Sequence, residues 1–261
     1  AMVVRPLRAP GQAASADMTA FMKNVVHLTV TFSDDSMEQG FGFIIGEQDL
    51  GKAERTLYVA TANHVVRKAS PDVTVKAIKA QFCTYKKSYP AELFEVFDAE
   101  LDFAVLEIPK PFPKFQWETS SFDPNPAAKT EAWFLGLQGE CVESGLVKIT
   151  KPTYKDLTIL DNQIQPGTSG APLISNKGII GLITRSEPGK AEAVKIGIIK
   201  QIVQDAGVPW GLQEFTATAS AQPTAVPTVE PTAKSTATPT IKPTATPTAK
   251  PTATPTAKPT A

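Results

Sequence analysis

The chain has 261 residues but few of the groups that mark common kinds of site. Its two cysteines, Cys83 and Cys141, are too few for a disulfide framework and too far apart for a short metal-binding motif. They could form one bridge or remain as two buried thiols, so they do not indicate a cellular compartment. No spacing typical of a metal site or cofactor motif stands out, and we expect neither a metal nor a cofactor.

Excess charge and long apolar runs are also lacking. The 26 lysines and arginines balance the 26 aspartates and glutamates. The sequence has no basic stripe with interleaved aromatic residues, which is the electrostatic footprint of nucleic-acid binding. No apolar run reaches the length of a membrane span, and residues 1–20 lack the apolar core of a signal peptide. We therefore expect no nucleic-acid partner and no membrane span.

The end of the chain has almost no large apolar side chains. From about Thr216 onward it consists almost wholly of proline, threonine, alanine and lysine, arranged in short repeats. Such a segment cannot bury enough apolar surface to offset its ordering entropy, which predicts a disordered tail with polyproline II character. Spacers of this kind are extended and accept O-glycans. We therefore expect a secreted or cell-envelope-associated protein, whose tail leads to a further domain or a cell-surface tether.

The remaining residues contain many short segments with strand character and one late helical segment. Residues 25–32, for example, alternate between apolar and polar side chains, as a half-buried strand does. A proline-rich stretch divides the strands into two halves, which predicts an all-β fold of two small barrels. The predicted parts are an irregular N-terminal segment (residues 1–20), a first barrel (21–112), a linker (113–130), a second barrel with a terminal helix (131–212) and a disordered repeat tail (213–261).

A run of small and turn-forming residues, QPGTSGAP at 165–172, separates two apolar segments of the second half. Its glycines, Gly167 and Gly170, bracket Ser169 and allow backbone conformations that other residues reach only with strain. Such a loop can hold a serine hydroxyl outward and turn nearby N–H groups toward it, as a nucleophile and an oxyanion hole require. An ordinary turn between two strands has the same composition. The loop alone does not decide between these interpretations.

The chain has only two histidines, so it has few candidates for a general base. His27 lies among threonines on the polar face of its strand, which predicts a surface histidine. His64 follows the apolar strand of residues 57–60, and strand ends are where loops present side chains to a cleft. A structural role for His64 remains open on position alone.

An aspartate gives His64 a partner. The alternation of residues 101–108 places Asp102 on the apolar face of its strand, where a carboxylate is costly unless hydrogen bonds satisfy it. An imidazole N–H is a suitable donor, and the pairing would fix the tautomer and orientation of the ring. Asp98 is a rival closer to the preceding turn. Asp102 could instead cap a turn or pair with a lysine.

Together, His64, Asp102 and Ser169 supply a base, a group that orients it and a nucleophile. The first two lie in the first half of the chain and the serine in the second. A cleft between two barrels would bring all three together.

Three motifs carry a resemblance to a known family: TANHVV at 61–66, DFAVL at 102–106 and GTSGAP at 167–172. They resemble the signature motifs of trypsin-like (chymotrypsin-fold) serine proteases, and the flanking sequence is most similar to the bacterial Deg-type branch. The resemblance covers the protease unit only. It implies two six-stranded antiparallel β-barrels with the active site between them.

The resemblance also implies roles for individual residues. Ser169 corresponds to the nucleophile, His64 to the general base and acid, and Asp102 to the residue that orients His64. The oxyanion hole would consist of the backbone N–H groups of Gly167 and Ser169. The substrate-binding residues implied are Gln163 near the specificity pocket and Thr184, Arg185 and Ser186 along the substrate backbone.

Two positions of the serine loop depart from the family pattern. Thr168 replaces the usual aspartate or asparagine, and Ala171 replaces a glycine.

The three candidate residues and the resemblance together predict a serine endopeptidase that works through an acyl-enzyme. The alternatives are a protease-fold binding or scaffold module with little or no turnover, and an esterase-like hydrolase with the same three residues.

Overall fold

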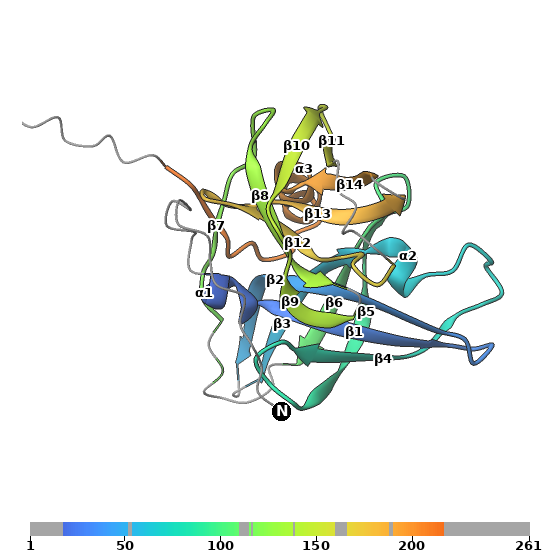
Figure 1. Ribbon diagram of the computed structural model, residues 1–261. Coiled ribbons are helices and arrows are strands. Elements are labelled where there is room, and N and C mark those ends of the chain that lie inside the picture. Colours follow the sequence, from blue (N-terminus) through green and yellow to red (C-terminus); the bar gives the residue numbers. More distant parts are fainter. Residues whose placement is uncertain are drawn as a thin grey trace, which may run out of the picture. The chain divides into compact units, whose positions relative to one another are not determined.

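The computed structural model describes residues 18–51, 54–109, 115, 117–137, 139–159, 166–187 and 190–216 (Figure 1). The predicted irregular segment up to residue 17, the repeat tail from residue 217 onward and Gln163 lie outside the described residues. Within the described part, no helix is long and apolar enough to cross a membrane.

The first barrel is a closed ring of antiparallel strands, coloured blue to green in Figure 1. Buried and half-buried residues alternate along its first strand, as the sequence predicts, so that one face lines the barrel core. The ring runs β1-β2-β3-β6-β5-β4 and closes because β4 pairs with β1. Its strands are β1 (Val25–Phe32), β2 (Met37–Gly51), β3 (Glu54–Ala62), β4 (Val75–Phe82), β5 (Ser88–Asp98) and β6 (Phe103–Pro109).

The second barrel is a ring of the same kind, coloured yellow-green to orange in Figure 1. It runs β12-β8-β10-β11-β14-β13 and closes through the pairing of β12 with β13. Its strands are β8 (Glu131–Leu137), β10 (Val147–Pro152), β11 (Asp156–Ile159), β12 (Pro172–Ser175), β13 (Gly178–Glu187) and β14 (Lys190–Lys195). The prediction of an all-β fold with two six-stranded antiparallel barrels is therefore confirmed.

A few short elements lie outside the two rings. Strand β9 (Glu140–Glu143) pairs with β8, while β7 (Ser121–Phe122) and β15 (Gln213–Glu214) extend the second sheet through parallel pairings. The helices are α1 (Met18–Met22), α2 (Asn63–Val66) and α3 (Ile196–Asp205). Helix α3 is the late helix expected from the sequence. It buries Ile196, Ile199 and Val203, and a left-handed Gly207 follows it, as is common after helix ends.

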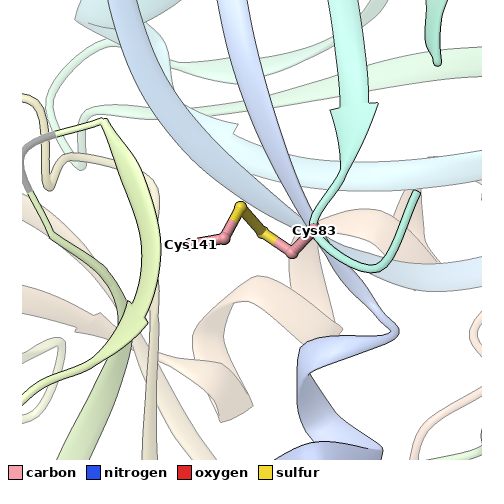
Figure 2. Close-up of a disulfide and its surroundings, with 2 residues drawn as sticks. All are labelled: Cys83 and Cys141. Atoms are coloured by element: carbon pink, nitrogen blue, oxygen red, sulfur yellow. A yellow bond between two sulfur atoms is a disulfide. The ribbon is translucent and has the colours of Figure 1, made fainter. Parts of the chain in front are cut away.

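The two barrels are joined by apolar packing and by a covalent bond. One hydrophobic cluster includes core residues of the first barrel together with Trp133, Ile174 and Leu182 of the second. Figure 2 shows the disulfide between Cys83, directly after β4, and Cys141 on β9. The pairing that the sequence left open is thus a bridge between the barrels.

Replacing both Cys83 and Cys141 with serine is expected to lower the free energy of unfolding. The bridged residues lie 58 apart in sequence. In the chain-entropy description, losing a bridge that closes a loop of this length costs about 4 kcal/mol. Urea unfolding followed by tryptophan fluorescence measures the change. The reduced wild-type protein serves as a control and should unfold at the same urea concentration as the double variant. Equal urea midpoints for the oxidised wild type and the double variant would contradict the prediction.

Candidate active site

His64 lies at the point where β3 leaves the wall of the first barrel. The strand runs directly into the single turn of α2, which buries Val65 and Val66 and leaves His64 exposed at the rim. The Asn63 N–H donates to the Asp102 carbonyl oxygen at 3.0 Å, tying this turn to the segment before β6. The local fold therefore places His64 and Asp102 side by side.

The Asp102 carboxylate uses both of its oxygens to hold His64. Oδ1 accepts a hydrogen bond from the His64 backbone N–H at 2.8 Å, and Oδ2 lies 2.6 Å from ring atom Nδ1. Asp102 is buried, whereas about half of the His64 side chain is exposed. A proton on Nδ1 facing the carboxylate leaves Nε2 as the acceptor on the exposed side of the ring. This arrangement suits a base that takes a proton from a group in the cleft.

The conformation of Asp102 differs from the one expected. The sequence predicted a strand residue on the apolar face, but Asp102 lies in the turn before β6 and has a left-handed φ of 56°. It is buried because this turn folds against α2. Its rival Asp98 instead accepts the backbone N–H groups of Glu100 and Leu101, so it stabilises the start of the same turn.

The serine loop is attached to the first barrel through its backbone. The Phe41 N–H on β2 donates to the Ser169 carbonyl oxygen at 2.8 Å. The Thr61 hydroxyl, three residues before His64, donates to the Phe41 carbonyl oxygen at 2.7 Å. Gly40 leaves room for this approach, since a Cβ there would lie 2.7 Å from a Val65 methyl group and 2.8 Å from the Ser169 oxygen. The backbone of Ser169 therefore lies beside the residue that follows His64.

Gly170 is required at its position for two reasons. Its φ is 84°, and a Cβ there would lie 1.9 Å from the Phe41 carbonyl oxygen. Its N–H donates to the Ile183 carbonyl oxygen on β13 at 2.7 Å. The loop is thus fixed between β2 of the first barrel and β13 of the second.

Ser169 and His64 form no side-chain hydrogen bond with each other in the described structure. Such bonds are often long before substrate binds. The N–H groups of Gly167 and Ser169, expected as the oxyanion hole, have no acceptor among the described residues. Thr168 is buried, and its hydroxyl has no hydrogen-bond partner among the described residues.

An open cavity of about 600 Å³ lies beside His64 and Asp102, and Arg185 contributes to its wall. Thr184 is buried and donates its hydroxyl to the Glu192 carbonyl oxygen at 3.3 Å. Ser186 continues the same strand. The lining of the cavity does not include Ser169. The described residues contain no cluster of three histidine, cysteine, aspartate or glutamate side chains arranged to hold a metal.

The sequence did not identify Phe41 and Thr61 as supports of the site. Thr61 carried a signal, because it is the polar residue within the apolar run of residues 57–62 at the end of β3, and such a residue needs a hydrogen-bond partner when it is buried. Phe41 acts through its backbone, which side-chain patterns do not report.

The prediction that His27 is an ordinary surface histidine is wrong. His27 is half-buried, its Nε2 atom has no partner in the described part of the structure, and its ring packs against Phe41 at 5.3 Å between centroids. Burial lowers its pKa from the ordinary 6.5, and Glu140 offsets this effect only in part. His27 therefore packs against Phe41, whose backbone N–H binds the Ser169 carbonyl oxygen.

The trypsin-like peptidase domain family matches residues 40–182, which is more than half of the chain and includes His64, Asp102 and Ser169. The chain belongs to this family. No curated protein matches the sequence.

Solved structures with the same fold include Rv3671c from M. tuberculosis H37Rv. An inactive form with a serine-to-alanine mutation has a TM-score of 0.54 and 19% identity, covering 78% of this chain and 97% of that chain. An inactive form of the Rv3671c protease has a TM-score of 0.52 and 18% identity, covering 76% of this chain and 100% of that chain. At these identities the similarity shows the trypsin-like peptidase fold alone, and the Deg-type placement stays a prediction.

Lowering the pH is expected to destabilise the fold through His27. Because its folded pKa is lowered, the unfolded chain binds the proton more readily. The free energy of unfolding is unaffected by His27 protonation above the ordinary pKa of 6.5. It declines as the pH falls below 6.5 and through the lowered folded pKa, because the unfolded chain is protonated first. Urea midpoints measured between about pH 7.5 and pH 5 should fall less in His27→Gln than in the wild type. The same pH dependence in both proteins would contradict this assignment.

Proposed function

We propose that this protein is a serine endopeptidase that hydrolyses peptide bonds through an acyl-enzyme. The observation that carries the proposal is the pair of hydrogen bonds that the Asp102 carboxylate accepts from His64, beside a serine loop held by the Phe41 backbone. This arrangement supplies an oriented base next to a serine on a constrained turn, which is what nucleophilic catalysis by serine requires. Membership of the trypsin-like peptidase family supports the same reaction class.

In the first half of the reaction, Ser169 Oγ attacks the scissile carbonyl carbon while His64 Nε2 takes the hydroxyl proton. Asp102 keeps the ring oriented through Nδ1 and stabilises its positive charge. The N–H groups of Gly167 and Ser169 stabilise the negative charge that develops on the carbonyl oxygen. His64 then gives its proton to the leaving amine as the C–N bond breaks, and the acyl group remains on Ser169.

In the second half, a water molecule attacks the acyl carbon and His64 takes its proton. The second tetrahedral intermediate collapses as the bond to Ser169 Oγ breaks, and the proton on His64 passes to the serine. The acid product leaves and the enzyme is regenerated. No cofactor takes part in this cycle.

Substrate binding is assigned to two segments. The backbone of Thr184, Arg185 and Ser186 pairs with an extended peptide, as peptides commonly add to an exposed strand edge. From the family resemblance, we propose Gln163 as a residue that shapes the pocket for the side chain at the cleavage site. Its neutral amide does not attract lysine or arginine, so we propose a neutral or apolar side chain there.

One observation favours an alternative, a protease-fold binding or scaffold module with little or no turnover. Ser169 and His64 are not hydrogen bonded to each other, and the hydroxyl of neighbouring Thr168 is buried without a partner among the described residues. A loop in this state could bind a peptide without cleaving it.

Labelling with a fluorophosphonate probe distinguishes the two functions. The wild type is expected to react, because the probe captures a serine activated by a base. Ser169→Ala should abolish labelling, and Asp102→Asn should slow it by about 10⁴-fold, the size of effect seen when this role is lost in a serine protease.

Ser88→Ala provides the matched control, since Ser88 is exposed at the start of β5. It should label like the wild type. An unlabelled wild type, or equal labelling of Ser169→Ala, would refute the peptidase proposal.

We also propose a secreted or cell-envelope location. The Cys83–Cys141 bridge supports it, because disulfides persist in oxidising compartments and are rare in the cytosol. The Pro/Thr-rich repeats from about Thr216 onward would then serve as a spacer to a surface tether or a further domain. Fractionation of the native cells with thiol labelling tests the proposal. It predicts an oxidised protein outside the cytosol, and a cytosolic protein with both thiols reduced would contradict it.

A further inference from the structure

The cavity beside His64 and Asp102 has an uneven distribution of charge. Its lining includes the cationic side chains of Arg67, Lys68 and Arg185, whereas Asp102 is the one carboxylate among its lining residues. Both Asp102 oxygens already accept hydrogen bonds from His64. Lys68 is also satisfied, since its Nζ binds the Glu38 carboxylate. The charges that remain for a ligand are those of the two arginines.

Arg67 is held in the cavity wall by an aromatic ring. Its guanidinium carbon lies 4.1 Å from the centre of the Phe97 ring, a distance typical of a cation–π contact. Its Nε is buried without a hydrogen-bond partner, and it forms no ion pair with any described carboxylate. The ring fixes the guanidinium without neutralising its charge.

Arg185 reaches the cavity from the second barrel. It is exposed, and the residue before it, Thr184, is buried, as the alternation of side chains along β13 requires. Its cross-strand neighbour Glu192 is bound by Lys190 at 2.7 Å. Among the described residues, Arg185 has no ion pair of its own.

Asp156 is another carboxylate that interacts electrostatically with Arg185. Burial and then Glu192 raise the pKa of Asp156, whereas the positive charges of Lys155, Arg185 and Lys195 act in the opposite direction. Asp156 and Arg185 form no ion pair with each other among the described residues.

Strand β13 offers a place for a peptide beside Arg185. From Arg185 to Glu187 it pairs with β14 on one side, and its pairing with β12 ends at Leu182. The second edge of this stretch therefore has no strand partner among the described residues. A peptide added to that edge would lie next to both the serine loop and the cavity.

We propose that this cavity is a subsite for an acidic side chain, Asp or Glu, of the peptide substrate, with Arg67 and Arg185 as the residues that determine this specificity. Arg67 belongs to the first barrel and Arg185 to the second, and both line the same cavity. Guanidinium groups bind carboxylates through charge-assisted, often bidentate hydrogen bonds. The identity of the ligand as a peptide near the scissile bond rests on the proposed peptidase function.

Binding to the inactive Ser169→Ala variant tests the subsite separately from turnover. The probes are fluorescent alanine-based octapeptides that carry one glutamate or one glutamine at each position in turn, followed by fluorescence anisotropy. At one or more positions the glutamate peptide should bind about tenfold more tightly than its glutamine partner, as expected for a charge-assisted contact. Adding Arg67→Gln or Arg185→Gln should remove most of this preference.

Arg55→Gln is the matched control, because Arg55 pairs with Glu47 and Asp49 on the β2–β3 hairpin and does not line the cavity. It should keep the tenfold preference. Salt at about 1 M should weaken the preference by screening. Equal binding of glutamate and glutamine peptides at every position, or a preference that survives loss of both cavity arginines, would overturn the proposal.

Turnover by the wild-type protein separates this proposal from the one on which it rests. Probe labelling of Ser169 with equal cleavage of glutamate and glutamine peptides would retain the peptidase and refute the acidic subsite. Absence of labelling with retained tighter binding of glutamate peptides would refute the peptidase and support the acidic preference of the cavity.

Discussion

A backbone hydrogen bond from the Phe41 N–H to the Ser169 carbonyl oxygen crosses between the two barrels at the candidate site. The Phe41 carbonyl oxygen accepts the Thr61 hydroxyl three residues before His64, so one residue contacts both parts of the site. Because these bonds involve the backbone of a barrel strand, the position of the serine does not depend on long, mobile side chains. Gly170 makes the approach sterically feasible. The rest of the barrel architecture provides a rigid support for this contact.

The sequence predicted the parts of the site more completely than their arrangement. Alternation along β1 and punctuation by proline and glycine predicted the barrels, because these patterns reflect local geometry. The same alternation wrongly predicted that Asp102 belongs to strand β6, because the alternating pattern continues into the preceding turn. Asp102 has a left-handed conformation in this turn, and its contact with α2 stabilises it there. The Phe41–Ser169 bond joins residues far apart in the chain. Local patterns carry no information on such a pairing.

Burial by distant segments explains the remaining differences. His27 stands among threonines on β1, and its strand alone indicates a solvated face. In the folded protein Phe41 and the β8–β9 hairpin cover that face; a Cβ at Gly139 would lie 3.6 Å from His27 Nε2. The pairing of Cys83 with Cys141 belongs to the same class, since it depends on how β9 meets the first barrel. Interactions between the halves of the chain were thus the least predictable part of the fold.

The disulfide divides the proposed reactive residues in an unexpected way. The covalent loop that it closes contains Asp102, whereas His64 precedes the loop and Ser169 follows it. A single backbone cut anywhere between Cys83 and Cys141 would therefore separate the chain into two polypeptides that remain linked by sulfur. A nick between the barrels would therefore leave both halves of the protein in one molecule.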